Sequence, residues 1–420
     1  MQADSSTGTR PRVLRSFDVK RLSLRMQQAQ RWLAIALGFS IPISTALDNV
    51  LSGAILLLWL ASGGFAQKWR VIRANPVALA ALALFALCIV GLLWSIGSSA
   101  DDLLFLRKYN NLLLIPILVT VFSEEQDRRR GLLAFGAALV VTLIASYGVA
   151  FGLIPTGGVI TGAPDDPTVF KWRIPHNILM AFACVLFAEL ARTTAGRARW
   201  AYAVLAVLAI INVVLMVKGR TGYVVLAGLT LLWIASNLRW KGLVAAIVLV
   251  VAGFTVVYQV SASFHARIRE AAAEAEQWRP GVATGTSVGI RLEFYRNTFE
   301  IAKRHPLLGV GTGGFFKAYE EQVRGTQMVA THNPHNMYLL VLVQFGLLGL
   351  VALAYLFYTQ WRCARQLSSR SDVVLAYALV VTFALSGLFN SMLIDHTESM
   401  FLAWMAGLLY GGLKSGSGAA

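Results

Sequence analysis

The chain has 420 residues, of which 57% are hydrophobic and only 14% are charged. A soluble globular protein usually carries about 25% charged residues, so this composition excludes a soluble enzyme, a disordered protein and a coiled coil. The formal net charge of +16 is compatible with nucleic-acid binding, but basic residues that flank membrane spans produce the same excess.

The apolar residues occur in runs of about 20, the length that a helix needs to cross ~30 Å of hydrocarbon. A segment in lipid must satisfy its backbone hydrogen bonds internally, so each run is predicted to be a helix. The sequence therefore predicts an all-α polytopic integral membrane protein. About twelve spans are expected, at residues 31–47, 50–66, 76–96, 103–122, 131–153, 175–191, 199–217, 221–237, 242–260, 334–361, 373–392 and 398–413.

Basic residues lie mainly at alternate ends of these spans. More than half of the 37 Lys and Arg residues fall on the side of the polar N-terminus 1–30 and of the linker-like tail 414–420, from Arg10 to Lys414. The positive-inside rule places that side, with both termini, in the cytoplasm. The excess of positive charge then sets the orientation of the protein in the membrane and attracts anionic lipids. No nucleic-acid partner is therefore predicted.

One long polar segment, 261–333, separates the first nine spans (31–260) from the last three (334–413) on the external side. Helices are predicted at 265–277, at 287–304 up to Pro306, and at 313–324. The layout is therefore a helical bundle with one large, structured external loop.

The tight external turn between spans seven and eight carries Lys218 and Arg220, flanked by Gly219 and Gly222. External loops normally lack Lys and Arg, and glycine lets the backbone approach a ligand. Ionisable residues of membrane segments are usually functional, so this turn is predicted to bind an anion. The alternative is a pair of snorkelling side chains that contact lipid headgroups.

Further external charges accompany this turn. Arg291 opens the second helix of the long loop, and Tyr295 follows one turn later on a similar face; an ordinary solvated helix face is the alternative interpretation. Two pairs that begin spans four and six are expected to add to a cationic external pocket, namely Arg107, Lys108, Arg173 and His176.

A histidine motif precedes span ten. Asn333 is predicted to be the N-cap and Pro334 the first helical residue, which puts His335 in the first turn. The helix dipole favours the neutral imidazole that a general base requires; a capping histidine is the alternative. His332 and His335 have no acidic or Cys neighbour in the sequence, so no metal is predicted.

Two other patterns are given no catalytic role. The stretch Gly309-Val-Gly311-Thr-Gly313-Gly is interpreted as a tight turn, because no strand precedes it and no Gly-Lys-Ser/Thr follows. Isolated external acids lack the Asp-x-Asp spacing that holds a metal and a sugar diphosphate; they are Asp48, Asp101, Asp102, Asp165, Asp166, Asp395 and Glu398.

Part of the sequence resembles the shared region of O-antigen ligases, O-antigen polymerases and bacterial O-oligosaccharyltransferases. The spacing from His335-Asn336 to Gly346 and Gly349 is similar to the pattern of the ligases, and the turn at Arg220 also fits the family. The residues that carry the resemblance are Gly289-Ile-Arg291, Tyr295, His305-Pro-Leu-Leu-Gly309-Val-Gly311-Thr-Gly313-Gly-Phe315 and His332-Asn-Pro-His335-Asn336.

The resemblance implies a GT-C-like membrane glycosyltransferase. It implies transfer of O-antigen polysaccharide, en bloc and with inversion, from undecaprenyl pyrophosphate to a sugar hydroxyl of lipid A–core. The reaction is expected at the periplasmic face of the bacterial inner membrane, without ATP, metal or other cofactor.

The chemistry of this reaction and the external charges described above suggest a role for each candidate residue. His335 is expected to be the base, and Arg220 and Arg291 are expected to stabilise the leaving diphosphate. The remaining candidates for substrate binding are Lys218, Tyr295, Asn336, His332, Arg107, Lys108, Arg173 and His176. Alternatives are a polymerase or a protein O-oligosaccharyltransferase with the same donor, and a lipid-linked sugar flippase, which would predict internal repeats that the sequence lacks.

Overall fold

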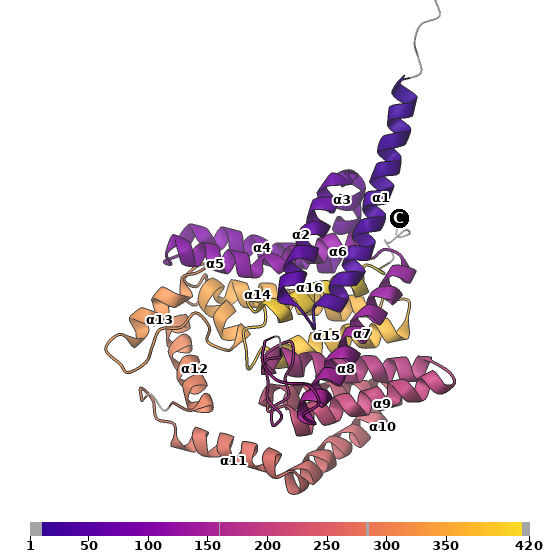
Figure 1. Cartoon of the computed structure of the whole chain (residues 1–420). Helices are drawn as coiled ribbons and strands as arrows, with labels where there is room; N and C mark the ends of the chain where they lie inside the picture. The colour runs from indigo at the N-terminus through magenta and orange to yellow at the C-terminus, as the bar shows by residue number, and fades with distance from the viewer. Residues whose placement is uncertain (1–10, 159, 283–284, 414–420) are drawn as a thin grey trace, which may run out of the picture.

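The computed structural model describes residues 11–158, 160–282 and 285–413. This part of the chain is helical, as predicted, and its only β-pairing consists of two isolated bridges (Figure 1). Residues 1–10 with Arg10, and the tail 414–420 with Lys414, lie outside the described residues. The helices are α1 (Pro11–Ser40), α2 (Thr45–Ala61), α3 (Phe65–Arg73), α4 (Pro76–Val90), α5 (Ser99–Tyr109), α6 (Leu114–Val121), α7 (Glu125–Ala150), α8 (Arg173–Thr193), α9 (Arg197–Ile211), α10 (Arg220–Val260), α11 (Ala262–Gln277), α12 (Ser287–Arg304), α13 (Phe315–Val323), α14 (Met337–Ala364), α15 (Arg370–Ser386) and α16 (His396–Tyr410).

Fewer of these helices than the predicted twelve are long and apolar enough to cross a membrane. Within the described residues seven helical stretches qualify, and the pair α2 and α3, bent by 116°, would make an eighth. This is consistent with a multi-pass membrane protein, whereas the number twelve and the GT-C-like architecture stay predictions. The seven stretches are Pro76–Trp94, Ser99–Val121, Glu125–Ala150, Arg173–Thr193, Arg197–Met216, Gly242–Val260 and Met337–Ala364.

Helix length explains part of the difference. α15 has 17 residues and α16 has 15, so at 1.5 Å per residue they are only about 25 and 22 Å long. The predicted span 31–47 is also divided, because α1 ends at Ser40. Pro42 follows two residues later, and a proline cannot continue a helix.

The predicted spans eight and nine fall within one helical element, the 41-residue α10. A straight helix of that length would extend for about 62 Å. Yet Arg220 at its start lies 3.1 Å from Glu270, ten residues beyond its end, and ten residues reach at most ~36 Å. α10 must therefore reverse direction, so that it forms two arms as the sequence predicted.

Polar contacts at the ends of the helices distinguish the two ends of the bundle. Arg192, near the end of α8, donates to Ser371 at 3.2 Å, and Arg370 donates to the Ser236 carbonyl at 2.8 Å. Arg173 begins the same helix α8, about 30 Å away by helix geometry, and pairs with Asp166. The residues that the positive-inside rule assigns to opposite sides thus gather at opposite helix ends.

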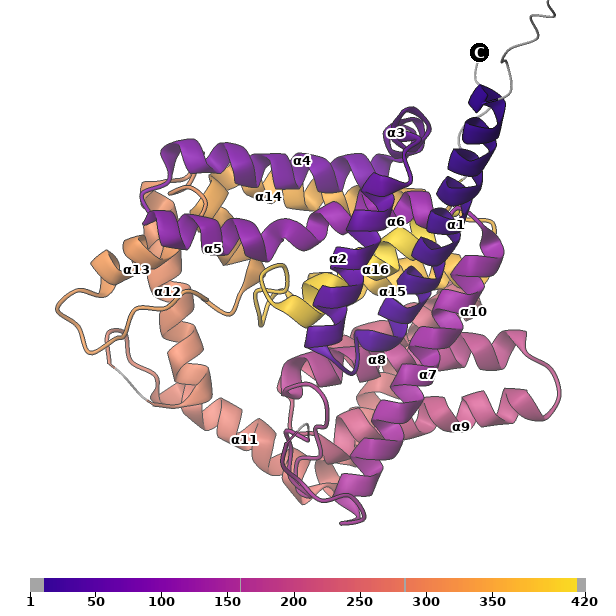
Figure 2. The same ribbon diagram turned by 45° about the horizontal axis from the view of Figure 1, so that its top comes forward.

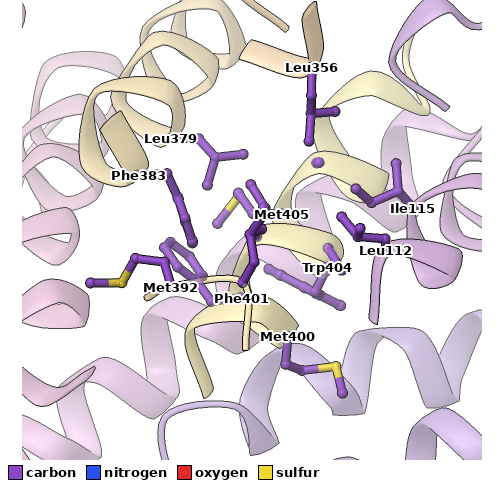
Figure 3. Packing of buried hydrophobic residues seen from close by; sticks show 14 of the residues in the cluster. Leu112, Ile115, Leu356, Leu379, Phe383, Met392, Met400, Phe401, Trp404 and Met405 are labelled. Atoms are coloured by element: carbon purple, nitrogen blue, oxygen red, sulfur yellow. The ribbon is translucent and has the colours of Figure 1, made fainter. Parts of the chain in front are cut away.

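α16 forms the centre of the bundle. Every residue from Thr397 to Tyr410 is buried, and a helix that is apolar on all faces belongs in a protein interior. Figure 3 shows Phe401 and Trp404 of α16 among side chains of α14, α15 and the segment that includes Leu112. The first turn of α16 is consequently fixed against the rest of the bundle.

A glycine-rich loop crosses a break in α14. Gly346 has a φ of +61°, and a Cβ there would lie 2.2 Å from the Leu307 backbone. The loop satisfies backbone groups at the break, since Val310 donates to Val343 and Leu347 donates to Pro306, both at 2.8 Å. Non-helical backbone inside a membrane bundle requires such partners, so the glycines form the tight turn predicted from the sequence.

The long loop after α10 contains three helices at the predicted positions, α11, α12 and α13. α12 and α13 lie beside the ends of α5 and α14, whereas α11 connects α12 to the end of α10 (Figure 2).

Candidate functional site

A cavity of about 970 Å³ lies between the bundle and the helices of the long loop. Its walls come from the segment before α8, the start of α10, α11, the start of α12 and the segments before α14 and α16. The residues that line it include Lys218, Arg220, Arg291 and His335. Side chains that are more than 100 residues apart in the sequence therefore share one cavity.

His335 lies just before α14 and not in its first turn. Asn336 is the N-cap, since its side chain accepts from Leu339 N at 3.0 Å, so the predicted cap at Asn333 is wrong. The Asn333 side chain instead accepts from the His335 N–H at 2.8 Å, a local turn that competes with helix initiation. His335 has a φ of +53°, a conformation that persists only where surrounding contacts hold it.

Two side chains of the predicted site hold this turn in place. The Tyr295 hydroxyl lies 3.0 Å from the His335 carbonyl oxygen and 2.9 Å from the Leu388 carbonyl oxygen, so its single hydrogen is shared between them. The Asn336 amide also donates to the Leu388 carbonyl, at 3.1 Å. Neither residue lines the cavity, and both support the turn that carries the histidine.

The ring of His335 is oriented by two residues between α15 and the start of α16. Its Nδ1 lies 3.1 Å from Asn390 Oδ1, and the Asn390 amide donates to Asp395 at 2.5 Å. An ionised carboxylate only accepts hydrogen bonds, so the amide nitrogen must face Asp395 and the amide oxygen must face the ring. This assignment puts the proton on Nδ1 and leaves Nε2 as the basic nitrogen.

Burial of His335 lowers the pKa of its imidazole, and the positive charge of Arg291 lowers it further, whereas the bond to Asn390 raises it. The neutral ring is therefore favoured near pH 7. The sequence predicted the same form from the helix dipole, but the helix begins after His335, so the main physical cause is desolvation.

Arg291 begins the second turn of α12 and is partly buried. Burial lowers the pKa of its guanidinium, but an arginine remains charged in proteins. No ion pair with a carboxylate is found for Arg291 among the described residues, unlike for its neighbours in the cavity.

The other cations of the cavity are already paired. Lys218 pairs with Asp165, and Arg220 pairs with Glu270 at 3.1 Å and Glu274 at 3.7 Å. The lining as a whole contains Arg173, Lys218, Arg220, Arg267 and Arg291 together with Asp165, Asp166, Glu270, Glu274, Asp395 and Glu398. The cavity lining therefore carries both signs of charge, and the spacing of these acids in the sequence does not reveal that they face the same cavity.

The model of the O-antigen ligase family matches residues 204–354. Over these residues the chain is similar to the O-antigen ligase family. The matched segment includes Lys218, Arg220, Arg291 and His335, and it ends before Asn390 and Asp395. No curated protein was found to match the chain in sequence.

Several residues that were predicted from their external position to bind substrate lie outside the cavity lining. His176 is buried and its Nε2 lies 3.0 Å from Asn212, so it belongs to the packing beneath the site. Arg107 and Lys108 stand near the end of α5 instead of beginning a helix. Of the two predicted pairs only Arg173 lines the cavity, where it binds Asp166.

His332 has an acidic partner that the sequence did not reveal. Its Nε2 lies 3.0 Å from Asp101 of α5, and its ring stacks on Phe316 with centroids 4.1 Å apart. These contacts join α5 to the long loop. Within the described residues no group of three or more His, Cys, Asp or Glu side chains is arranged to hold a metal ion.

The sequence analysis did not single out Asn390 and interpreted Asp395 only as an isolated acid. Asn390 is 55 residues from His335, and no local motif links the two positions. The structure adds both residues to the site because the break before α16 folds back against α14.

Proposed function

We propose that the chain is an O-antigen ligase that transfers a polysaccharide from undecaprenyl pyrophosphate to a sugar hydroxyl of lipid A–core. Transfer takes place at the periplasmic face of the bacterial inner membrane. One observation carries the proposal, namely that Arg220, Arg291 and His335 line a single cavity. The family match over the same residues supports it.

His335 acts as the general base in this proposal. Its Nε2 removes the proton from the acceptor hydroxyl while that oxygen attacks the anomeric carbon of the donor sugar from the face opposite the diphosphate. The bond from the anomeric carbon to the phosphate oxygen breaks, and its electron pair leaves with the lipid diphosphate. A positioned base contributes about 10²–10⁴-fold to such a step, and the configuration inverts.

The two arginines act on the leaving group. Negative charge grows on the diphosphate as the glycosidic bond breaks. Each guanidinium group can donate two parallel hydrogen bonds to phosphate oxygens. Donor groups that are preorganised around the developing charge stabilise the transition state by about 3–4 kcal/mol each. This arrangement requires no metal ion, and Lys218 is a further candidate for the same anion.

The test of the proposed function uses purified protein with lipid-linked polysaccharide and lipid A–core. We expect His335→Ala to abolish transfer, whereas His305→Ala, an exposed histidine outside the cavity, should retain it. Full transfer by His335→Ala would reject the base role.

The lipopolysaccharide of a deletion strain distinguishes the family's reactions. Bare core with accumulated lipid-linked chains is the expected result for a ligase. Core that bears a single repeat unit would instead identify a polymerase, and an unchanged lipopolysaccharide would contradict both.

A further inference from the structure

Two glutamates of α11 bind the groups of the cavity that would otherwise bind an anion. Glu270 and Glu274 are one helical turn apart and both approach Arg220, at 3.1 Å and 3.7 Å. Glu274 also accepts the backbone N–H of Val288 at 2.8 Å. Its carboxylate thus lies between Arg220 and the first turn of α12, directly before Arg291.

These contacts are the ones that an incoming anion would use. Helix N-termini and arginines are the usual ligands of phosphate groups, and here both are satisfied by carboxylates of the same chain. A diphosphate that approached Arg220 with Glu270 and Glu274 still in place would meet like charges within a few ångströms, which is unfavourable.

α11 is packed lightly enough to move. Among its side chains that the structure describes, only Phe264 is buried. Glu270 is about half exposed, with 49% of its side-chain surface accessible, and ion pairs at such exposure contribute little, about 0.2–1 kcal/mol each. Glu270 is therefore displaced at little cost. The Glu274 side chain is only 12% exposed, but a phosphate that displaces it can replace it as the acceptor for Arg220 and for the Val288 N–H.

We propose that Glu270 and Glu274 are built-in competitors that limit the affinity of the site for a lipid diphosphate and thereby promote release of the leaving lipid diphosphate after transfer. The inference rests on the proposed function. The donor's diphosphate displaces both carboxylates from Arg220 and from the start of α12. When the polysaccharide has been transferred, the carboxylates return and the product diphosphate is expelled.

The experiment measures binding of farnesyl diphosphate, a soluble lipid diphosphate, to the full-length protein in detergent. Each of Glu270→Gln and Glu274→Gln should bind it about threefold more tightly, and the double variant about tenfold, as expected for weak, partly exposed ion pairs. Gln keeps an acceptor for the Val288 N–H, so α12 stays capped. Glu276→Gln, an exposed residue of the same helix outside the cavity, should bind like the wild type.

A second ligand tests how many of the two carboxylates each phosphate group displaces from the cavity. Farnesyl monophosphate has one phosphate group, so the double variant should gain only about threefold for it. Transfer by the double variant should also be inhibited by added farnesyl diphosphate at about tenfold lower concentration than transfer by the wild type.

Different binding results would overturn this inference and the proposed function. Unchanged or weaker farnesyl diphosphate binding by a folded double variant would overturn this inference, because the carboxylates would then orient Arg220 and not compete for it. Equal binding by the wild type, Arg220→Ala and Arg291→Ala, or no binding by any of them, would overturn the proposed function and this inference with it.

Discussion

At the residue scale, the state of His335 depends on a chain of hydrogen bonds that ends at Asp395. With this carboxylate ionised, Asn390 can present only its oxygen to Nδ1, and Nε2 stays free to accept a proton. Burial raises the pKa of Asp395, whereas the Asn390 bond lowers it. Asn390 and Asp395 therefore differ in role from the arginines, because they act on the substrate only by positioning His335.

The first prediction concerns Asp395→Asn. The Asn390 amide could then turn, so that its nitrogen faces the ring and the wrong histidine tautomer is stabilised. We expect transfer to fall by about 10²-fold, within the range that a positioned base contributes. Farnesyl diphosphate binding should stay within about twofold of the wild type, and loss of that binding instead would show that Asp395 acts on the donor site.

The second prediction follows from the direction of the His335 pKa. Because the neutral ring is the base, kcat/KM should rise as pH increases through the pKa of His335 and then level off. Burial places this pKa below the ordinary value of 6.5, so the acid limb should lie below pH 6.5. A pH profile of transfer checks the limb, and a midpoint well above 6.5 would disagree with a desolvated imidazole.

The third prediction separates bidentate binding from charge alone. Arg220→Lys and Arg291→Lys keep one positive charge but lose the planar pair of donors. We expect each to reduce transfer by at least about 10²-fold, the loss typical of one removed transition-state donor. Wild-type rates in both lysine variants would rule out paired hydrogen bonds to phosphate.

At the element scale, the break in α14 determines where the histidine turn meets the long loop. The loop 305–314 passes across Gly346, so that the external helices are held against the helix that follows His335. Gly346 of the ligase-type spacing therefore has a structural reason, since a Cβ at this position does not fit beside the Leu307 backbone.

The fourth prediction is that Gly346→Ala destabilises the protein by more than about 2 kcal/mol, because an L-residue at this φ is strained and its Cβ meets backbone. Gly53→Ala is the matched control, since nothing lies within 4 Å of its Cβ position in α2. Thermal unfolding in detergent should show a lower melting temperature for Gly346→Ala only. Equal melting temperatures for the two variants would contradict the packing argument.

At the scale of the whole molecule, the two ends of the bundle are predicted to face opposite sides of the membrane. The cavity lies at one end, and the basic loops from Arg192 to Arg199 lie at the other. The positive-inside rule assigns the second end to the cytoplasm, which leaves the cavity facing the periplasm.

The fifth prediction tests this orientation with single cysteines. Cys88, Cys184 and Cys363 are buried and would be replaced by alanine. An impermeant thiol reagent added to spheroplasts should label Glu276→Cys, whereas Arg197→Cys should react only after the membrane is opened. The reverse pattern would invert the topology and place the site in the cytoplasm.

The sequence alone determined the helical class, the apolar segments and the positions of α11, α12 and α13, because hydropathy and helix propensity are local properties of the chain. It also drew attention to Arg220, Arg291 and His335, since charges in external turns and a family pattern are visible without a structure. It misplaced the cap of α14, where the Asn333 side chain binds its own backbone instead of starting the helix.

Only the tertiary structure decided what these residues face. The partners of His335 and Arg220 come from segments 55 and 50 residues away, and no local pattern encodes such contacts. The fold-back of α10 brings Glu270 and Glu274 to Arg220, and the central position of α16 brings Asp395 to Asn390. The physical reason is that charge, burial and hydrogen bonding depend on which segments pack together, and that packing is a property of the whole chain.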